Sequence, residues 1–273
     1  MSVIEATFLG IVQGLTEFLP VSSSGHLVLF SQLLKVQEPS LVFEIVVHAG
    51  TLLAVVVVFR AEVLLLVSSF FKLLRKPQQA KELVQTDAGC RLLWRLVLAT
   101  LPVVILALVL KDHIEGLFMS SLFVGFMLLV TGTVLYLSQC RETGRKDLAE
   151  LSASDALLVG LGQAVAVLPG ISRSGTTIAV GLTRGLDRDS AARFSFLLSI
   201  PAILGALVFS LDDLFGGATS IGGGAFFAGL LTSAITGYLA IHLLLDLVKR
   251  GKLVWFSYYT WFVGTLVIVL SFL

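Results

Sequence analysis

The chain has little charge for its length, and its charge has no pattern that suits a nucleic acid. Only 14% of its 273 residues are charged, whereas 56% are hydrophobic, and the mean hydropathy is +0.97. A soluble domain usually carries about 25% charged residues, so this surface is too apolar to face water on all sides. The net charge of +1 and the lack of a basic cluster argue against a nucleic-acid partner. We therefore expect most of the surface to face the lipid bilayer.

Cysteine and early positive charge are also scarce. Cys90 and Cys140 are too few and too far apart for a disulfide framework or a metal knuckle. The first 34 residues contain no Lys or Arg, so the positive start of a cleavable signal peptide is missing. We expect the apolar N-terminal stretch to belong to the folded protein.

Long apolar runs are abundant, and a membrane-crossing helix needs about 20 mostly apolar residues. Two apolar stretches, 3–34 and 155–183, are interrupted by proline, glycine and serine, so neither is typical of a simple span. Six other stretches qualify as spans: 41–59, with an apolar continuation toward the low 70s, 93–110, 119–138, 191–211, 223–247 and 254–273.

The polar joints between these spans indicate their orientation, because Lys and Arg collect in cytoplasmic loops. The joints 72–91, 139–155 and 248–252 are rich in Lys and Arg, whereas 111–116 holds one Lys and 212–222 holds none. The alternation works if each broken stretch enters and leaves the membrane on one side. We therefore predict two re-entrant hairpins that enter from opposite faces, with both chain termini outside the cell.

The two broken stretches also resemble each other in sequence. Three spans follow each of them, and an odd number of spans inverts the second copy. The sequence thus predicts an all-α polytopic membrane protein, one integral membrane domain with an inverted-topology repeat. Repeat 1 (1–140) holds the re-entrant helix-loop-helix hairpin 3–34, and repeat 2 (150–273) holds the hairpin 155–183, each with three of the six spanning helices. Residues 150 positions apart match at Gly10 and Gly160, Gln13 and Gln163, Ser22 and Ser172, Ser24 and Ser174, and Gly25 and Gly175.

The first hairpin carries a carboxylate, three hydroxyls and an imidazole. Gln13 and Glu17 are four residues apart and share one helical face. Pro20 then breaks the helix, and Ser22, Ser23, Ser24 and His26 follow. The alternative, that His26 has only a structural role as a hydrogen-bonded packing residue, stays open. Glu44 and His48, four residues apart on the first span, could also join such a site.

The second hairpin carries Arg173 among hydroxyls. A turn rich in Gly and Ser before a helix N-terminus presents unpaired N–H groups and suits a phosphate. The Arg173 guanidinium can fork two phosphate oxygens, and Ser172, Ser174 and Thr177 surround it in the sequence. An Arg and a Glu inside membrane segments indicate a functional site. The alternative is an Arg173–Glu17 ion pair that only pins the hairpins together.

Together these side chains suit phosphoryl transfer, which needs a nucleophile, cations on the phosphoryl oxygens, and an acid or base. Carboxylates also bind Mg²⁺ or Ca²⁺ against a diphosphate. Gly10 and Gly14 fit close helix packing better than a phosphate cradle. Asp212 and Asp213 are most simply solvated loop charges.

Two motifs resemble those of a known family. The run Gln13-x-x-x-Glu17-Phe-Leu-Pro-Val-Ser-Ser-Ser-Gly-His26 resembles the (Glu/Gln)-x-x-x-Glu motif and adjoining Ser/His segment of bacterial undecaprenyl-diphosphate phosphatases, also called bacitracin-resistance proteins. The run from Pro169 to Thr177 is similar to their Pro-Gly-x-Ser-Arg-Ser-x-x-Thr motif, and the segment from Phe194 to Pro201 also has the family pattern. The resemblance covers essentially the whole chain.

The resemblance implies a multi-pass enzyme of the bacterial cytoplasmic membrane that depends on a divalent cation. It would remove the terminal phosphate of undecaprenyl diphosphate and so recycle a lipid carrier for cell-wall synthesis, with its pocket expected at the outer face. Its polyprenyl diphosphate substrate and the bilayer would be its partners, and whether copies form a homo-oligomer stays open.

The same resemblance implies roles for individual residues. Gln13 and Glu17 would hold the metal, with Glu17 also a base; a neutral Gln13 departs from the Glu often found there. Ser23 would attack with His26 as proton shuttle, while attack by His26 or by water stays open. Arg173 would bind the diphosphate, helped by Ser172, Ser174, Thr177 and Ser24.

Two rival functions differ in what the sequence offers them. The acid-phosphatase superfamily needs a Lys-x6-Arg-Pro stretch and a second His and Asp after its Ser-Arg, and this chain has neither. A transporter or flippase for a phosphorylated lipid fits equally well with inverted repeats and broken helices, because function belongs to the site rather than to the fold.

Overall fold

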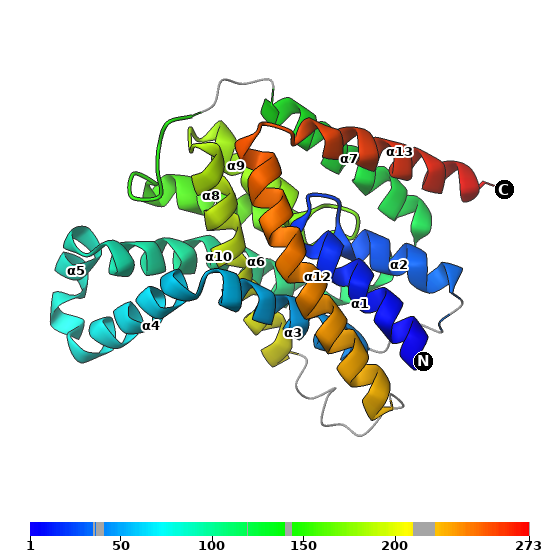
Figure 1. The fold of residues 1–273 in the computed structure, drawn as a ribbon. Helices are drawn as coiled ribbons and strands as arrows, with labels where there is room; N and C mark the ends of the chain where they lie inside the picture. Colours follow the sequence, from blue (N-terminus) through cyan, green and yellow to red (C-terminus); the bar gives the residue numbers. More distant parts are fainter. Residues whose placement is uncertain (35, 37–40, 119, 140–143, 210–221, 273) are drawn as a thin grey trace.

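The computed structural model describes residues 1–34, 36, 41–118, 120–139, 144–209 and 222–272. In this part of the chain, helices joined by turns and loops are the only regular secondary structure apart from one isolated β-bridge (Figure 1). Asp212, Asp213 and Cys140 lie outside the described residues. The helices are α1 (Val3–Phe18), α2 (Ser23–Leu33), α3 (Leu41–Val58), α4 (Arg60–Arg75), the short η1 (Pro77–Gln79), α5 (Ala80–Thr86), α6 (Ala88–Phe118), α7 (Ser121–Gln139), α8 (Ala153–Val165), α9 (Arg173–Thr183), α10 (Arg188–Phe209), α12 (Gly223–Lys249) and α13 (Val254–Leu270).

The first broken stretch is a pair of short helices, as predicted. α1 begins with a capping box, in which the Ser2 hydroxyl accepts from the Glu5 N–H and the Glu5 carboxylate accepts from the Ser2 N–H. It ends before Pro20, because the residue before a proline disfavours helical backbone. α2 then begins at the cap Ser22, which has a φ of +71°, a conformation that costs energy for a residue with a side chain.

The second broken stretch repeats this construction 150 residues later. Ser152 and Asp155 form the capping box of α8, and Ser172 caps α9 by accepting from the Gly175 N–H at 3.1 Å. Gly170 in the intervening turn has a φ of +94°, which only glycine adopts readily. The limits of α2 and α9 are themselves 150 positions apart. The expected helix-loop-helix form is thus confirmed for both stretches.

Each hairpin packs its first helix against a helix from the other half of the chain. In α1, a Cβ added at Gly10 would lie 2.8 Å from the Gly229 carbonyl oxygen of α12. In α8, a Cβ added at Gly160 would lie 2.3 Å from the Ala99 carbonyl oxygen of α6. The close-packing interpretation of Gly10 is therefore confirmed. This exchange of partners is compatible with repeats at 1–140 and 150–273, while the division itself and the inverted orientation stay predictions.

Within the described residues, four helical segments are long and apolar enough to cross a membrane by themselves, and α3 with α4 makes a fifth if the bent pair is one span. The multi-pass helical class is therefore confirmed, but the predicted number of six spans is only partly matched. The sixth predicted span, α13, is apolar but only 17 residues long. The four segments are Ala88–Val109, Ser121–Gln139, Arg188–Val208 and Gly223–Lys249.

The joint expected at 72–91 is confirmed, because α4 ends at Arg75, only the short η1 and α5 follow, and α6 begins at Ala88. The joint expected at 111–116 is wrong as a break. α6 continues through 111–116, where no proline or glycine precedes Gly116 to stop it. α3 and α4 are instead bent by 92° around Phe59, whose buried ring lies 5.7 Å from the Phe196 ring. At the far end, the Lys72 ammonium and the Cys90 N–H hold the pKa of Asp87 at about 2.

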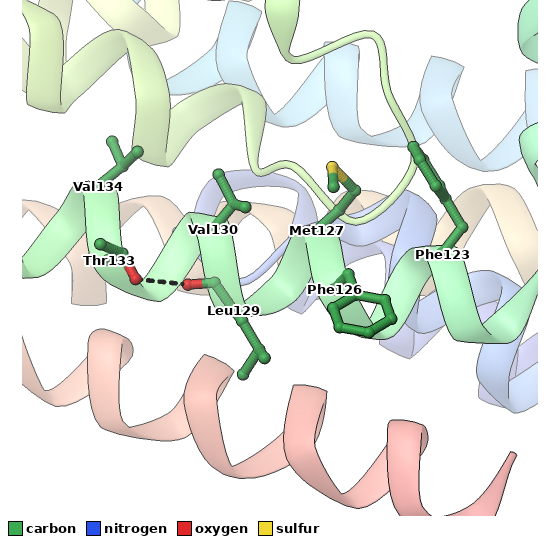
Figure 2. A pocket seen from close by; sticks show the side chains of 7 residues that line it. All are labelled: Phe123, Phe126, Met127, Leu129, Val130, Thr133 and Val134. Atoms are coloured by element: carbon green, nitrogen blue, oxygen red, sulfur yellow. Dashed lines mark hydrogen bonds between the residues drawn. The ribbon is translucent and has the colours of Figure 1, made fainter. Parts of the chain in front are cut away.

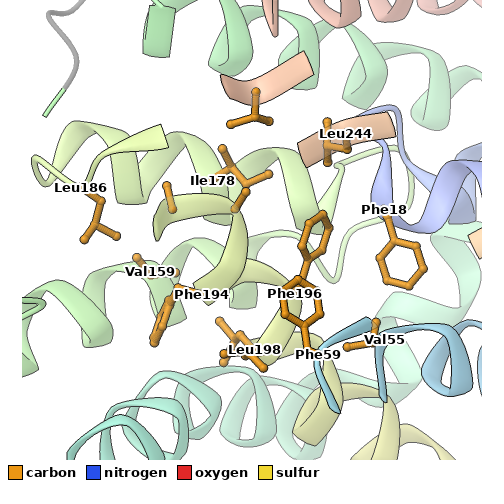
Figure 3. Packing of buried hydrophobic residues seen from close by; sticks show 14 of the residues in the cluster. Phe18, Val55, Phe59, Val159, Ile178, Leu186, Phe194, Phe196, Leu198 and Leu244 are labelled. Atoms are coloured by element: carbon orange, nitrogen blue, oxygen red, sulfur yellow. The ribbon is translucent and has the colours of Figure 1, made fainter. Parts of the chain in front are cut away.

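The main hydrophobic core contains residues from both halves of the chain, and it includes Phe18 at the end of α1 (Figure 3). The Phe18 and Phe196 rings meet edge to face at 5.7 Å, and Phe59 packs on the same Phe196 ring. All three side chains are at most 2% exposed. Because Phe18 follows Glu17 in the chain, this packing holds the Glu17 backbone at a defined place.

Substituting Gly14 with Ala should lower the thermal stability of the purified protein. A Cβ at this position would lie 2.6 Å from the Ser233 carbonyl oxygen and 2.8 Å from the Gly237 nitrogen, and backbone atoms of a packed helix do not move cheaply. We expect a loss of about 1–3 kcal/mol. Gly205→Ala is the matched control, because nothing lies within 4 Å of its added Cβ. Equal melting temperatures for the two variants would contradict the packing.

Candidate active site

The Glu17 carboxylate is the point where the two hairpins meet. Its Oε1 accepts from Arg173 Nη2 at 2.6 Å, and its Oε2 accepts from the Ser23 hydroxyl at 2.7 Å and from Gln13 Nε2 at 3.0 Å. Glu17 is only 8% exposed. A carboxylate with so little solvent needs such partners, because a buried unpaired charge is costly. The structure thus brings together four of the predicted site residues from α1, α2 and α9.

The Arg173 guanidinium is fixed by one further contact. Its Nη1 donates to the Ser195 carbonyl oxygen of α10 at 3.2 Å, and its side chain stays 16% exposed. The ion pair with Glu17 that the sequence left as an alternative is therefore present. Arginine has five N–H groups, and these two bonds leave three that can donate to an incoming anion. The pair can accordingly hold the hairpins together and still bind a phosphate.

The predicted hydroxyls of the second hairpin lie together but point into the protein. The Ser172 hydroxyl is 3.2 Å from the Ser174 hydroxyl, and the latter donates to the Leu19 carbonyl oxygen of the first hairpin at 3.3 Å. The Thr177 hydroxyl is 2.6 Å from the Ser195 hydroxyl. Ser172, Ser174 and Thr177 are each 1% exposed. In this conformation they hold the Arg173 turn in place rather than face an open pocket.

The serines of the first hairpin are more accessible. Ser23 and Ser24 occupy the first turn of α2 and are partly exposed. The Ser24 hydroxyl lies 3.3 Å from the Ser22 hydroxyl, whereas the Ser23 hydroxyl donates its proton to Glu17. A hydroxyl that donates to a carboxylate is placed for deprotonation. The hydrogen bond of Ser23 therefore goes to Glu17 and not to His26.

His26 has partners at both ring nitrogens. Its Nδ1 lies 2.8 Å from the Ser22 carbonyl oxygen, and its Nε2 lies 2.8 Å from the Tyr259 hydroxyl of α13. Sequence reasoning missed Tyr259, as it missed Ser195 and Thr131, whose hydroxyl accepts from the Ser172 N–H at 3.0 Å. Nothing distinguishes Tyr259 in the sequence, because tyrosines on apolar helices are common at membrane interfaces.

His48 of α3 also reaches the site. Its Nε2 lies 3.8 Å from Glu17 Oε2, and its Nδ1 lies 2.7 Å from the Glu44 carbonyl oxygen, which can only accept. The side chain of His48 is 31% exposed. The structure thus places His48 beside Glu17, and its participation in the site stays a prediction.

The described residues offer two oxygen ligands for a divalent cation. Gln13 Nε2 donates to Glu17, which leaves the buried Gln13 Oε1 without a partner. Among the described residues no cluster of three His, Cys, Asp or Glu is present. Mg²⁺ commonly takes one or two protein ligands and completes its shell with water and phosphate oxygens. The donor set of Gln13 and Glu17 therefore fits a hard cation that is shared with a phosphate.

An apolar groove of about 600 Å³ runs along the outer side of α7 (Figure 2). It contains no charged group, and its one hydroxyl, from Thr133, donates to the Leu129 carbonyl oxygen. It is therefore unsuited to a phosphate. The same helix touches the second hairpin, because a Cβ on Gly170 would lie 2.7 Å from Met127 Cβ. The lining residues are Phe123, Phe126, Met127, Leu129, Val130, Thr133 and Val134.

Comparisons with known proteins agree over nearly the full chain. Residues 6–266 match the family model described as bacitracin resistance protein BacA. An undecaprenyl-diphosphatase of Methanobrevibacter smithii is 47% identical over 270 residues, which are 98% of this chain and 97% of the relative. Proteins of the same name from Desulforapulum autotrophicum and Carboxydothermus hydrogenoformans are 44% and 41% identical, with at least 98% of each chain covered. The region matched by the family model contains every residue of the site, the whole second hairpin and all but the first residues of the first hairpin.

Proposed function

Because the chain belongs to the bacitracin resistance protein BacA family, we propose that it is an undecaprenyl-diphosphatase whose active site is the cluster around Glu17. The enzyme hydrolyses undecaprenyl diphosphate to undecaprenyl phosphate and inorganic phosphate. One observation carries the assignment of the site: a carboxylate joins a serine hydroxyl and an arginine from opposite hairpins within 2.7 Å. These are the base, the nucleophile and the anion-binding group that phosphoryl transfer requires.

In the reaction we propose, Ser23 Oγ attacks the terminal phosphorus while its proton passes to Glu17 Oε2. The bond between that phosphorus and the bridging oxygen breaks, and undecaprenyl phosphate leaves. Arg173 N–H groups neutralise the phosphoryl oxygens during this step. As they turn to the phosphate, they weaken their hold on Glu17 and make its carboxylate a stronger base. Water then attacks the phosphorus of the phosphoserine, and the bond between that phosphorus and Ser23 Oγ breaks. Glu17 returns its proton to Ser23 Oγ, and inorganic phosphate is released.

His26 fits a proton shuttle better than a nucleophile. Attack by an imidazole needs a free nitrogen, and both nitrogens of His26 are within 2.8 Å of a partner. A proton can instead be exchanged at Nε2 while the Tyr259 hydroxyl stays in place, because a hydroxyl can both donate and accept a hydrogen bond. We propose that His26 exchanges protons with the leaving undecaprenyl phosphate and the incoming water. We assign the covalent step to Ser23.

Gln13 and Glu17 would hold Mg²⁺ or Ca²⁺, which supplies charge neutralisation to the diphosphate when it is bound. We expect EDTA to lower phosphate release at least tenfold and either cation to restore it. Substituting Gln13 with Leu should raise the Mg²⁺ concentration for half-maximal activity about tenfold, because the amide oxygen is lost, whereas Gln13→Glu should lower it. Equal Mg²⁺ requirements in all three proteins would remove Gln13 from the cation site.

The direct test is phosphate release by detergent-purified protein from undecaprenyl or farnesyl diphosphate. The alternative function is an inverted-repeat transporter, which would bind or move the lipid without cleaving it. We expect release that depends on protein concentration and on the cation. Folded protein that binds the lipid but releases no phosphate would favour the transporter or flippase.

For the topology we propose that both termini lie outside the cytoplasm, because Lys and Arg collect in the joints 72–91, 139–155 and 248–252. A periplasmic alkaline phosphatase fused after residue 272 should be active in cells, and a fusion at Lys249 should be inactive. If the fusion at Lys249 were active and the fusion after residue 272 inactive, the termini would lie in the cytoplasm and the proposed orientation would be wrong.

A further inference from the structure

The imidazole of His26 has a hydrogen-bonding partner at each of its two ring nitrogens and an aromatic ring against one face. Ser22 lies one turn earlier in the chain, and its carbonyl oxygen faces Nδ1 at 2.8 Å. The Tyr259 hydroxyl faces Nε2 at 2.8 Å, and the Tyr259 ring lies parallel to the imidazole within 10°, with centroids 5.7 Å apart. His26 is only 3% exposed, so these contacts define its orientation.

The two contacts determine which nitrogen carries the proton in the neutral ring. A carbonyl oxygen can only accept, so Nδ1 must donate to Ser22. The neutral imidazole has a single N–H, and Nε2 is therefore an acceptor for the Tyr259 hydroxyl. In this arrangement the lone pair of Nε2 is held by a group that can donate a proton and can also accept one.

Tyr259 reaches this position from a distant part of the chain. It lies on α13, 233 residues after His26, and α13 packs along α7, the helix whose Thr131 holds the turn of the second hairpin. Tyr259 itself is 43% exposed, whereas His26 is buried. The hydrogen bond at Nε2 thus links the buried imidazole to a side chain that is partly exposed.

We propose that Tyr259 is a positioning residue that fixes the tautomer and the ring orientation of His26 for proton exchange at Nε2. The inference rests on the proposed role of His26 in hydrolysis. Tyr259 need not touch the diphosphate, because its effect passes through the imidazole. Loss of its hydroxyl therefore slows turnover and leaves substrate binding almost unchanged.

Tyr259→Phe tests this, because it removes the hydroxyl and keeps the stacked ring. We expect kcat for undecaprenyl diphosphate to fall three- to tenfold while KM stays within twofold, since a hydrogen bond of about 1 kcal/mol corresponds to roughly fivefold in rate. Tyr258→Phe is the matched control. Tyr258 is the preceding residue, is 50% exposed and makes ring contacts with Trp255 and Trp261, so its kcat should stay at the wild-type value.

A double-mutant cycle separates positioning of His26 from a merely structural effect. On the His26→Ala background, Tyr259→Phe should cause no further loss of the residual activity. An equal fold-loss on both backgrounds, or a wild-type kcat for Tyr259→Phe alone, would overturn the proposal. If His26→Ala itself were fully active, the assigned role of His26 would fail, while phosphate release by the wild type would still establish the hydrolase.

Discussion

Glu17→Gln should lower kcat/KM for undecaprenyl diphosphate by on the order of 10³-fold, the upper part of the range for loss of one electrostatic group in a water-poor site. The amide keeps the size of the side chain and can still accept a hydrogen bond. It cannot take the proton of Ser23, and it has no charge to offer Arg173 or a cation. Steady-state phosphate release by purified protein measures the loss.

The matched control for this change is Glu62→Gln. Glu62 of α4 also pairs with an arginine, Arg193, at 2.9 Å, but it lies outside the Glu17 cluster. Its variant should keep the wild-type rate within a few-fold. Near-normal turnover in folded Glu17→Gln would remove Glu17 from the chemistry and with it the proposed base.

Arg173→Ala should lower kcat/KM by 10²-fold or more, through both a higher KM and a lower kcat. Arg173 binds the diphosphate in the ground state and stabilises the charge that develops on the phosphoryl oxygens in the transition state. Its loss therefore raises KM and lowers kcat. Arg173→Lys should recover only part of the loss, because an ammonium cannot donate in a planar fork. Arg184→Lys, at the other end of α9 and paired with Asp155 at 2.8 Å, is the control and should stay active.

A charge exchange tests whether the Glu17–Arg173 pair only pins the hairpins together. The double variant Glu17→Arg with Arg173→Glu restores an ion pair across the same gap but moves the base and the anion-binding group to the wrong hairpins. We expect it to be inactive. Recovery of activity in the exchanged protein, or full activity of Arg173→Lys, would support the pinning interpretation instead.

Local features of the sequence were enough to predict the two hairpins. Pro20 ends α1, the Pro169–Gly170 turn separates α8 from α9, and serine caps stand at equivalent places. The side chains nearest to the breaks were also identified, because charged groups inside membrane segments have few roles other than function. The meeting of Glu17 with Arg173 followed from placing both breaks at one interface.

The contacts that could not be predicted come from residues without a local signal. Tyr259 and Ser195 reach the site from α13 and α10, and each is an ordinary residue for an apolar helix. The 92° bend at Phe59 was also missed, because no proline or glycine marks it in the sequence; the Phe59 ring packs on Phe196 there. Polar residues also led to a predicted joint at 111–116, where α6 in fact continues, since charged residues are compatible with a continuous helix.

The measurement that tests the central claim most directly is the site of covalent phosphorylation during turnover. Purified protein would react with undecaprenyl diphosphate labelled in the terminal phosphate, be quenched within milliseconds in neutral detergent that preserves phosphohistidine, and be mapped by peptide mass spectrometry. Our account predicts label on Ser23 in the wild type and none in Ser23→Ala. Label on His26, or full phosphate release by Ser23→Ala, would contradict it.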